Sequence, residues 1–265
     1  CAASIELNLR NWPKTMIQLT LPPEPPELTA KKKKLTEAYA ASCRAGKPKA
    51  VWNTAYIRDA LLEMTHGKCA YSEVRLQGRG AYWDVEHFKC KDLYPDSVVE
   101  WGNLLPACEF CNRSAKRDHD VVAVPIVNPI KDRPGEHLYV RRGRFFPKDD
   151  KGEKTIEVLN LNDEVNLLRS RFEVCRDFAD RLQCCKVLKD KCVTSSDCGY
   201  LRNKFMALLR GGLPDREYSA TVATFLLCEQ RDLVQEIEQQ LRAWKLWDEE
   251  MESTKAILSK NALPK

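Results

Sequence analysis

Apolar residues recur at helical spacing through the last hundred residues of the chain. After Lys154 one amphipathic face extends from Leu167 to Leu188, and a second helix is expected at Tyr200 to Arg210. Gly211 to Pro214 then breaks the pattern. A longer helix is expected from about Glu217 to Met251, because apolar residues again recur three and four positions apart.

The middle of the chain alternates between helical and strand patterns. A helix is predicted between Trp52 and Met64, and polar–apolar alternation predicts a strand from Tyr82 to Phe88. A short second strand follows a long polar loop, and a helix begins at Cys111. The β-branched stretch that comes next predicts a further strand. These last three elements span Leu104 to Ala107, Cys111 to Arg117, and Val121 to Ile130.

The first 48 residues read as an extended segment. Four prolines, at positions 22, 23, 25 and 26, disfavour regular structure, and Lys31 to Lys34 form a basic run. That run suits either a solvated helix start or contact with nucleic acid. We therefore expect an α+β fold in three parts: residues 1–48 as the extended segment, 49–160 as a central domain, and 161–265 as a helical domain.

Composition and charge narrow the function classes only slightly. The chain has 265 residues, of which 43% are hydrophobic and 31% charged, with a formal net charge of +5. This is ordinary for a globular protein and compatible with a nucleic-acid partner. The window from Arg113 to Lys148 is more basic, with nine Lys or Arg against four Asp or Glu. It is either a phosphate-binding surface or a solvated basic one.

Twelve cysteines are an unusual load for a chain of this length. No signal-like or membrane-length apolar run accompanies them, so a disulfide framework is not favoured. We expect a reduced, cytoplasmic setting without a membrane partner. Some thiols would then hold metal, and others would act as small core residues.

The segment from Asp84 to Lys116 carries the candidate chemistry. His87 follows Glu86 at the end of the predicted strand, where its imidazole could act as a general base on an attacking water. The alternative is a buried, hydrogen-bonded histidine. Asn103 could tie the loop to the strand, fix the tautomer of His87 through its side-chain oxygen, or simply belong to a turn.

Oxygen ligands near this histidine suit a hard divalent metal. Glu86 offers a carboxylate and Asn112 an amide oxygen at a helix start, with Asp84 as a reserve ligand. Asn112 could equally be a helix N-cap. The sequence thus predicts a Mg²⁺ or Mn²⁺ site. Beside it stand candidate phosphate contacts on the following helix, namely Arg113, Lys116 and Arg117.

Three cysteines have the spacing of a structural zinc site. Cys108 and Cys111 form one Cys-x-x-Cys pair, while Cys69 belongs to a second pair in which Ser72 replaces a thiol. The sequence leaves open whether zinc is lost or retained. If it is retained, its fourth ligand could be Cys90, His66 or water.

The ordered motifs resemble the HNH, or ββα-metal, nucleases, in the variant that gives His87, Asn103 and Asn112 as the catalytic series. More narrowly, the chain resembles the PtuB-like HNH subunits of Septu-type anti-phage systems, over about residues 50 to 170. The matching motifs are GKCAYSE (67–73), EHF (86–88), Trp101 to Lys116, Asn128 to Leu138, and Thr155 to Asn162.

This resemblance carries several implications. It implies a ββα-metal core, a divalent metal, and a PtuA-like partner ATPase of the SMC or ABC type, sometimes with retron components. Two positions depart from the family pattern: Ser72 breaks the zinc knuckle, and Cys90 stands where proline is usual.

The expected function is metal-dependent cleavage of nucleic acid, with DNA as the expected substrate, as an effector in phage defence. Cleavage of cellular RNA is an alternative. A second class is a non-catalytic module that binds nucleic acid or acts as an adaptor through its Cys-x-x-Cys turn. A third is a cysteine-rich scaffold that holds the ATPase. Glu86, His87 and Asn112 favour the enzyme, because a binding module has no need of a base beside a carboxylate.

Overall fold

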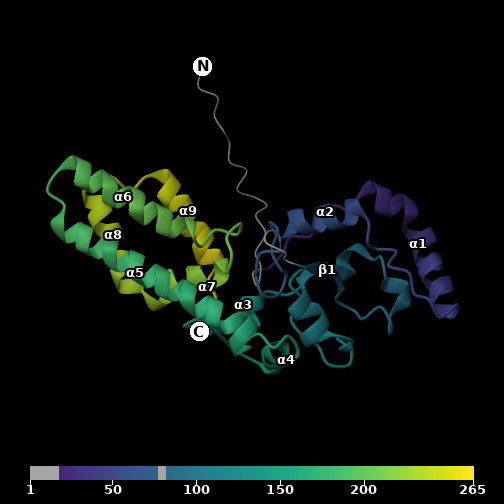
Figure 1. Ribbon diagram of the computed structural model, residues 1–265. Helices are drawn as coiled ribbons and strands as arrows, with labels where there is room; N and C mark the ends of the chain where they lie inside the picture. The colour runs from purple at the N-terminus through teal and green to yellow at the C-terminus, as the bar shows by residue number, and fades with distance from the viewer. Residues whose placement is uncertain (1–17, 77–81) are drawn as a thin grey trace, which may run out of the picture.

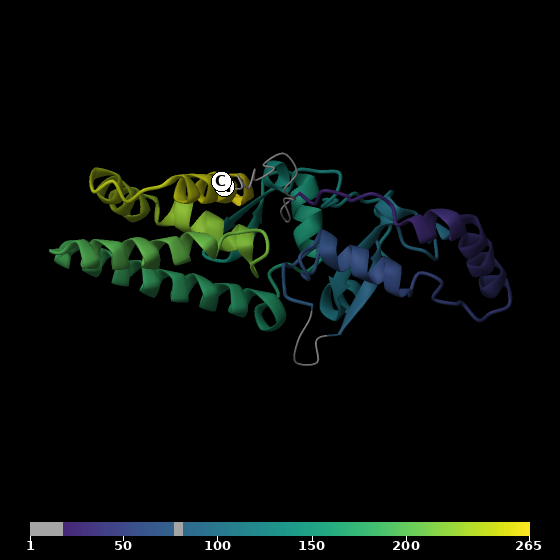
Figure 2. The same cartoon turned by 90° about the horizontal axis from the view of Figure 1, so that it is seen from above.

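The computed structural model describes residues 18–76 and 82–265, and it has the expected α+β character. Helices α5 to α9 gather in one lobe, while α1, α2 and β1 lie in the other (Figure 1). The same separation is visible from above (Figure 2). Within the described ranges, none of the helices is both long and apolar enough to cross a membrane.

The first lobe begins with two helices, a two-stranded sheet and short helical turns. Its elements are α1 (Pro26–Arg44), α2 (Ala55–Met64), β1 (Trp83–His87), the 3₁₀ turns η1 (Pro95–Ser97) and η2 (Trp101–Asn103), β2 (Leu104–Cys108) and the π-helical η3 (Phe110–Lys116). The expectation of an extended N-terminal segment is wrong for Pro26–Arg44. Pro26 occupies the first helical turn, where its missing N–H costs nothing. Residues 1–17 of that segment lie outside the described residues.

The strands β1 and β2 pair antiparallel, and η3 follows β2 almost at once. His87 lies opposite Leu104 and Trp83 opposite Cys108 in the register. These three elements match the strand–strand–helix order predicted for 82–117. The further strand expected from Val121 to Ile130 is wrong. That segment forms turns, because Pro125 and Pro129 cannot donate to a sheet, although Val127 and its apolar neighbours are still buried.

A second hairpin was not predicted. It consists of β3 (Leu138–Arg141) and β4 (Arg144–Pro147), which pair antiparallel between the short helix α3 (Pro134–His137) and α4 (Asp150–Val158). Arg142 and Gly143 form its turn with φ of +50° and +72°. Two consecutive positive φ values are typical of a two-residue hairpin loop.

The second lobe is helical throughout. Its elements are η4 (Glu164–Leu168), α5 (Arg169–Lys191), α6 (Ser195–Arg210), α7 (Ser219–Thr224), η5 (Phe225–Glu229), α8 (Arg231–Ala243) and α9 (Glu249–Asn261). The single long helix expected beyond Glu217 is wrong, because the chain turns after Glu229 and again near Lys245. Its apolar spacing continued across these turns because successive helices bury residues in one core, which includes Leu226, Ile237 and Met251.

Two hydrophobic cores correspond to the two lobes, and a buried ion pair joins them. The ammonium of Lys68 lies 3.2 Å from Glu73 in the first lobe, and it donates to the Arg216 carbonyl and the Ser219 hydroxyl in the second. Glu73 accepts in return from Ser219 and from the backbone N–H of Ala220. Lys68 and Glu73 are 1% and 3% exposed, so this junction is closed to water.

Candidate functional site

The strand β1 and the helix η3 border a cleft of about 560 Å³ on the surface of the first lobe. His87 at the end of β1, Asp84 on the same strand and Asn112 near the start of η3 all reach this cleft. Six of the residues that line it are Arg58, Asp84, His87, Asn112, Arg113 and Arg117. The structure therefore brings His87, Asp84 and Asn112 into one place, although 25 residues or more separate Asn112 from the other two.

The ring of His87 is held in one orientation. Its Nε2 lies 2.9 Å from the carbonyl oxygen of Val98. A carbonyl can only accept, so Nε2 carries the proton and Nδ1 keeps its lone pair. The indole of Trp52 packs edge-on against the imidazole, with centroids 4.5 Å apart. Burial lowers the pKa of His87 to about 4, so the ring is neutral near pH 7 and Nδ1 can accept a proton.

Asn103 holds the loop that supplies Val98. Its side-chain oxygen accepts from the N–H of Lys89, and its amide donates to the carbonyls of Lys89 and Ser97. The prediction that Asn103 ties the loop to the strand is confirmed. The alternative, that its own oxygen fixes the tautomer of His87, is wrong, because the neighbouring Val98 carbonyl does so.

Asp84 and Asn112 are direct neighbours. The amide nitrogen of Asn112 lies 3.2 Å from the Asp84 carboxylate, which also accepts two bonds from the guanidinium of Arg113, at 2.7 and 2.8 Å. The Arg113 side chain is 62% exposed. Arg117 also reaches the cleft and is exposed at the end of η3. The cleft thus combines a carboxylate, an amide and exposed guanidinium groups around the imidazole.

Glu86 and Lys116 form a buried pair instead of facing the cleft openly. Their charged atoms are 2.6 Å apart, and the side chains are 4% and 0% exposed. Lys116 also donates to the His87 carbonyl, and Tyr71 donates to Glu86. Burial raises the pKa of Glu86, while Lys116 opposes that rise. The expectation that Lys116 contacts phosphate is wrong because its ammonium is inaccessible. Glu86 borders the cleft, although its side chain is only 4% exposed, and its role as a metal ligand stays a prediction.

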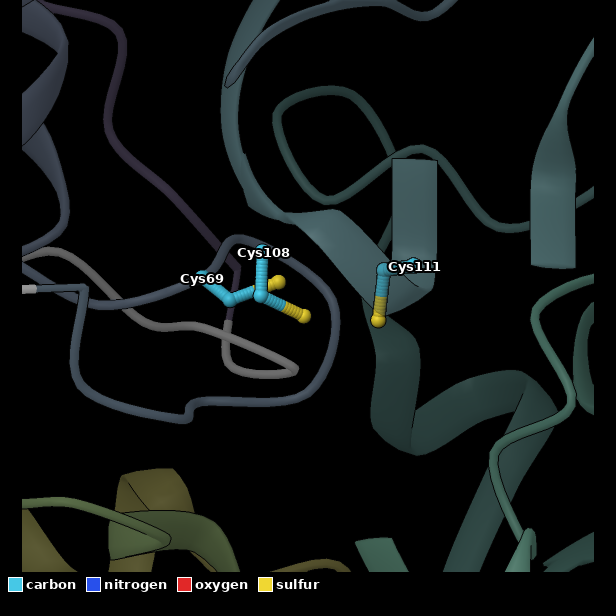
Figure 3. A group of neighbouring side chains, drawn as sticks. All are labelled: Cys69, Cys108 and Cys111. Atoms are coloured by element: carbon cyan, nitrogen blue, oxygen red, sulfur yellow. The ribbon is translucent and has the colours of Figure 1, made fainter. Parts of the chain in front are cut away.

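Three thiols converge behind β1 and β2. The sulfur atoms of Cys69, Cys108 and Cys111 all lie within 4.8 Å of one another (Figure 3). The hydroxyl of Ser72 lies 3.7 Å from the Cys108 sulfur, at the position left by the missing thiol. Burial by itself raises the pKa of the Cys69 thiol, but hydrogen bonds from Cys108, Cys111 and Ser72 lower it well below its ordinary value.

This donor set fits zinc. Tetrahedral Zn²⁺ binds sulfur at about 2.3 Å, which places ligand sulfurs about 3.8 Å apart. Neither alternative protein ligand joins the thiols: Cys90 lies instead with Asp92 and Asp118 at the cleft, and His66 is not among the clustered groups. Ser72 or water is then left as the fourth ligand. All cysteines of the described residues are free thiols.

Sequence reasoning missed the residues that position His87. Val98 acts through its backbone carbonyl, which no side-chain pattern reveals. The sequence pattern indicates Trp52 only as an apolar residue of a helix, not as a contact of His87. Arg58 and Asp118 also reach the cleft but have no recognisable spacing to the other groups. Loop packing creates these contacts, so no short motif could have indicated them.

Comparison with known proteins identifies the group to which the chain is related. No protein-family model matches it. It is 35% identical to Septu protein PtuB from Bacillus thuringiensis over 216 residues, covering 80% of this chain and 82% of that protein. Septu protein PtuB from Bacillus mycoides (strain KBAB4) is 29% identical over 153 residues, 46% of this chain and 51% of the relative.

A protein of a different name from the same strain also matches. A stretch of 141 residues in Septu protein PtuA of Bacillus mycoides (strain KBAB4) is 27% identical to this chain, covering 43% of the chain and 20% of that protein. The identity and coverage shared with the Bacillus thuringiensis protein establish the relationship. The chain belongs to the Septu PtuB family.

Proposed function

We propose that this protein is a metal-dependent endonuclease of the HNH type that acts in anti-phage defence together with a PtuA-like ATPase. The observation that carries the proposal is the cleft in which His87, Asp84 and Asn112 meet. The lone pair on Nδ1 of a neutral, oriented imidazole suits a general base. A carboxylate beside an amide is a donor set that suits Mg²⁺ or Mn²⁺.

Each of these residues has a separate role in the proposed hydrolysis of a phosphodiester. His87 takes a proton from the attacking water at Nδ1, and Val98 holds the opposite nitrogen through its carbonyl. Asn103 is a positioning residue, because it fixes the loop that presents Val98. A divalent ion held by Asp84 and Asn112 would neutralise charge on the phosphate and stabilise the leaving oxygen.

Arg113 links metal and substrate binding. At present its guanidinium covers both oxygens of Asp84. For Asp84 to hold a divalent ion, Arg113 has to leave that carboxylate and the amide of Asn112 has to turn its oxygen inward. The freed guanidinium, with Arg117 beside the same cleft, can then bind the substrate phosphate.

The thiol cluster takes a structural part in this proposal. Cys108 ends β2 and Cys111 lies in η3, so zinc held by them and by Cys69 would fix the helix against the hairpin. That fixation keeps Asn112, the residue after Cys111, at its distance from Asp84.

The names of the relatives support the proposed partner. Two relatives are Septu PtuB proteins, and one protein named PtuA carries a stretch similar to this chain. Sequence of this kind therefore occurs covalently joined to the rest of a PtuA protein, which supports PtuA as the partner. The proposed substrate is DNA, with RNA as the alternative.

Incubation with labelled nucleic acid tests the proposal. The purified protein, alone and with the PtuA-like partner, is offered DNA and RNA with Mg²⁺ or Mn²⁺. His87→Ala should lower the cleavage rate on the order of 10² to 10⁴-fold. His119→Ala is the matched control, since that ring also bonds a carbonyl but does not reach the cleft. Near-normal cutting by a folded His87→Ala protein would overturn the assignment.

A further inference from the structure

The hairpin β3–β4 has one buried face and one face turned to solvent. Its buried face consists of Leu138, Val140 and Phe145, which are at most 4% exposed. On the other face Tyr139 lies opposite Phe146, and Arg141 lies opposite Arg144. The two aromatic rings are stacked, with centroids 5.1 Å apart and planes 15° from parallel. The outer face therefore presents two arginines beside an aromatic pair.

The arginines of this face have no ion-pair partner among the described residues. Like charges directly opposite each other on paired strands are destabilising. Within residues 18–76 and 82–265, no carboxylate forms an ion pair with Arg141, Arg142 or Arg144, whereas Arg133 and Arg169 nearby in sequence each have a glutamate partner. The hairpin thus places two like charges opposite each other without a partner carboxylate among the described residues. An anionic ligand from outside would supply the missing charge.

The hairpin turn is fixed in place. The backbone N–H of Arg142 donates to the Glu229 carboxylate at 2.8 Å. A Cβ on Gly143 would lie 3.1 Å from the backbone of Arg171, so the turn packs closely against α5. The arginines on either side of this turn therefore project from a rigid base, which lowers the entropy lost when they bind a ligand.

Across from the hairpin, the start of α5 completes a hollow of about 710 Å³. Arg169 and Phe172 contribute to its lining, and Phe172 is 53% exposed, which is unusual for a large apolar ring. Among the described residues that line the hollow, Glu164 supplies the carboxylate against four arginines. The hollow does not share any lining residue with the cleft around His87.

We propose that this hollow binds single-stranded nucleic acid. Guanidinium groups of Arg141, Arg142 and Arg144 would contact successive phosphates, while unpaired bases would stack on Phe172 and Phe146. Phe172 is exposed and Phe146 half-buried. Arginine beside accessible aromatic rings is the combination by which proteins bind single strands, because every base has a π-face and every linkage a charge. The proposal rests on the proposed function for its ligand class, and it adds a contact surface separate from the cleavage cleft.

Binding of a labelled single strand tests the inference. Fluorescence anisotropy is measured with oligo(dT), with oligo(U) and with a DNA duplex, using the full chain with His87→Ala so that nothing is cut. Arg141→Gln/Arg144→Gln should lower the magnitude of the salt slope for single strands by about 1.4, or about 0.7 for each lost phosphate contact. Phe172→Ala should weaken binding roughly 5- to 150-fold, as expected for the loss of one stacked base.

A matched variant controls for net charge. Arg44→Gln/Lys191→Gln removes two exposed charges outside the hollow and should change affinity less than about 2-fold. Comparing oligo(dT) with oligo(U) tells which nucleic acid is preferred. Parental binding that survives both hairpin changes would overturn this inference and leave the nuclease proposal standing. Sensitivity to the arginines without sensitivity to Phe172→Ala, or preference for the duplex, would also overturn it. No binding of any nucleic acid by the parent would overturn both.

Discussion

The pKa of His87 sets the pH range in which the proposed base can act. Burial lowers it to about 4, below the ordinary value of about 6.5. The ring therefore keeps its lone pair as the pH falls to about 4, and the acid limb of cleavage assigned to His87 should lie near there. Trp52→Ala should admit water to the ring, raise the pKa and move that limb upward. An NMR titration of the ring gives the pKa directly, and a midpoint near 6.5 in the parent would contradict this account.

The buried ion pair of Glu86 and Lys116 should contribute more to stability than the exposed pair of Asp84 and Arg113. Lys116→Met would leave the Glu86 carboxylate without its counter-charge inside the protein, at a cost of about 3–5 kcal/mol in the free energy of unfolding. Arg113→Met removes an exposed, solvent-screened partner of Asp84 and should lower the stability far less. Urea denaturation of both variants checks the contrast. Equal losses would mean that Lys116 contributes no more than a surface cation.

For individual residues, the sequence indicates which groups line the cleft but not which of them form ion pairs. His87, Asp84 and Asn112 were recognisable because their residue types and order suit one kind of chemistry. Nothing in the sequence showed that Lys116 would pair with Glu86 in the interior, which leaves the ammonium inaccessible and the Glu86 side chain only 4% exposed at the cleft. That choice depends on which side of η3 packs against β1, which is decided by tertiary contacts.

At the scale of the elements, the thiol cluster predicts that zinc holds β2 and η3 together. If zinc joins β2 to η3, Cys111→Ser should remove the metal and cost about 4 kcal/mol or more in stability. Cys198→Ser, at a partly exposed thiol outside the cluster, should stay within about 0.5 kcal/mol. Elemental analysis of protein purified without chelator gives the metal content. A zinc-free parent would reduce the three thiols to packing residues.

Elements were predictable where one periodicity dominated a stretch. The alternation around Val85 and the helical spacing before Met64 predicted β1 and α2. The hairpin β3–β4 escaped notice because its outer face mixes arginine with aromatic residues, so no simple polar–apolar alternation stands out. The break near Lys245 contains no glycine or proline, so the helical spacing of apolar residues continues through it in the sequence.

The C-terminal helices are part of the hydrophobic core of the second lobe. Met251 and Leu258 of α9 are fully buried, and Leu263 bonds to the backbone of Val140 in the first lobe. Deletion of Ala243 to Lys265 should therefore give insoluble protein, because it exposes the core of one lobe and loosens the other. Solubility and a thermal melt check this result. A soluble, folded truncation that no longer co-purifies with the PtuA-like partner would instead make the segment a docking element.

The junction between Lys68 and Ser219 has a consequence for how the protein matures on the ribosome. The two residues are 151 positions apart, so the cysteine-bearing loop emerges long before the neutral groups that complete the hydrogen bonds of Lys68 and Glu73. Until α7 has been made, the nascent first lobe holds a charged pair with unfilled hydrogen bonds. A chain that stops before α7 would therefore lack the groups that close this junction, and its Lys68–Glu73 pair would stay open to water.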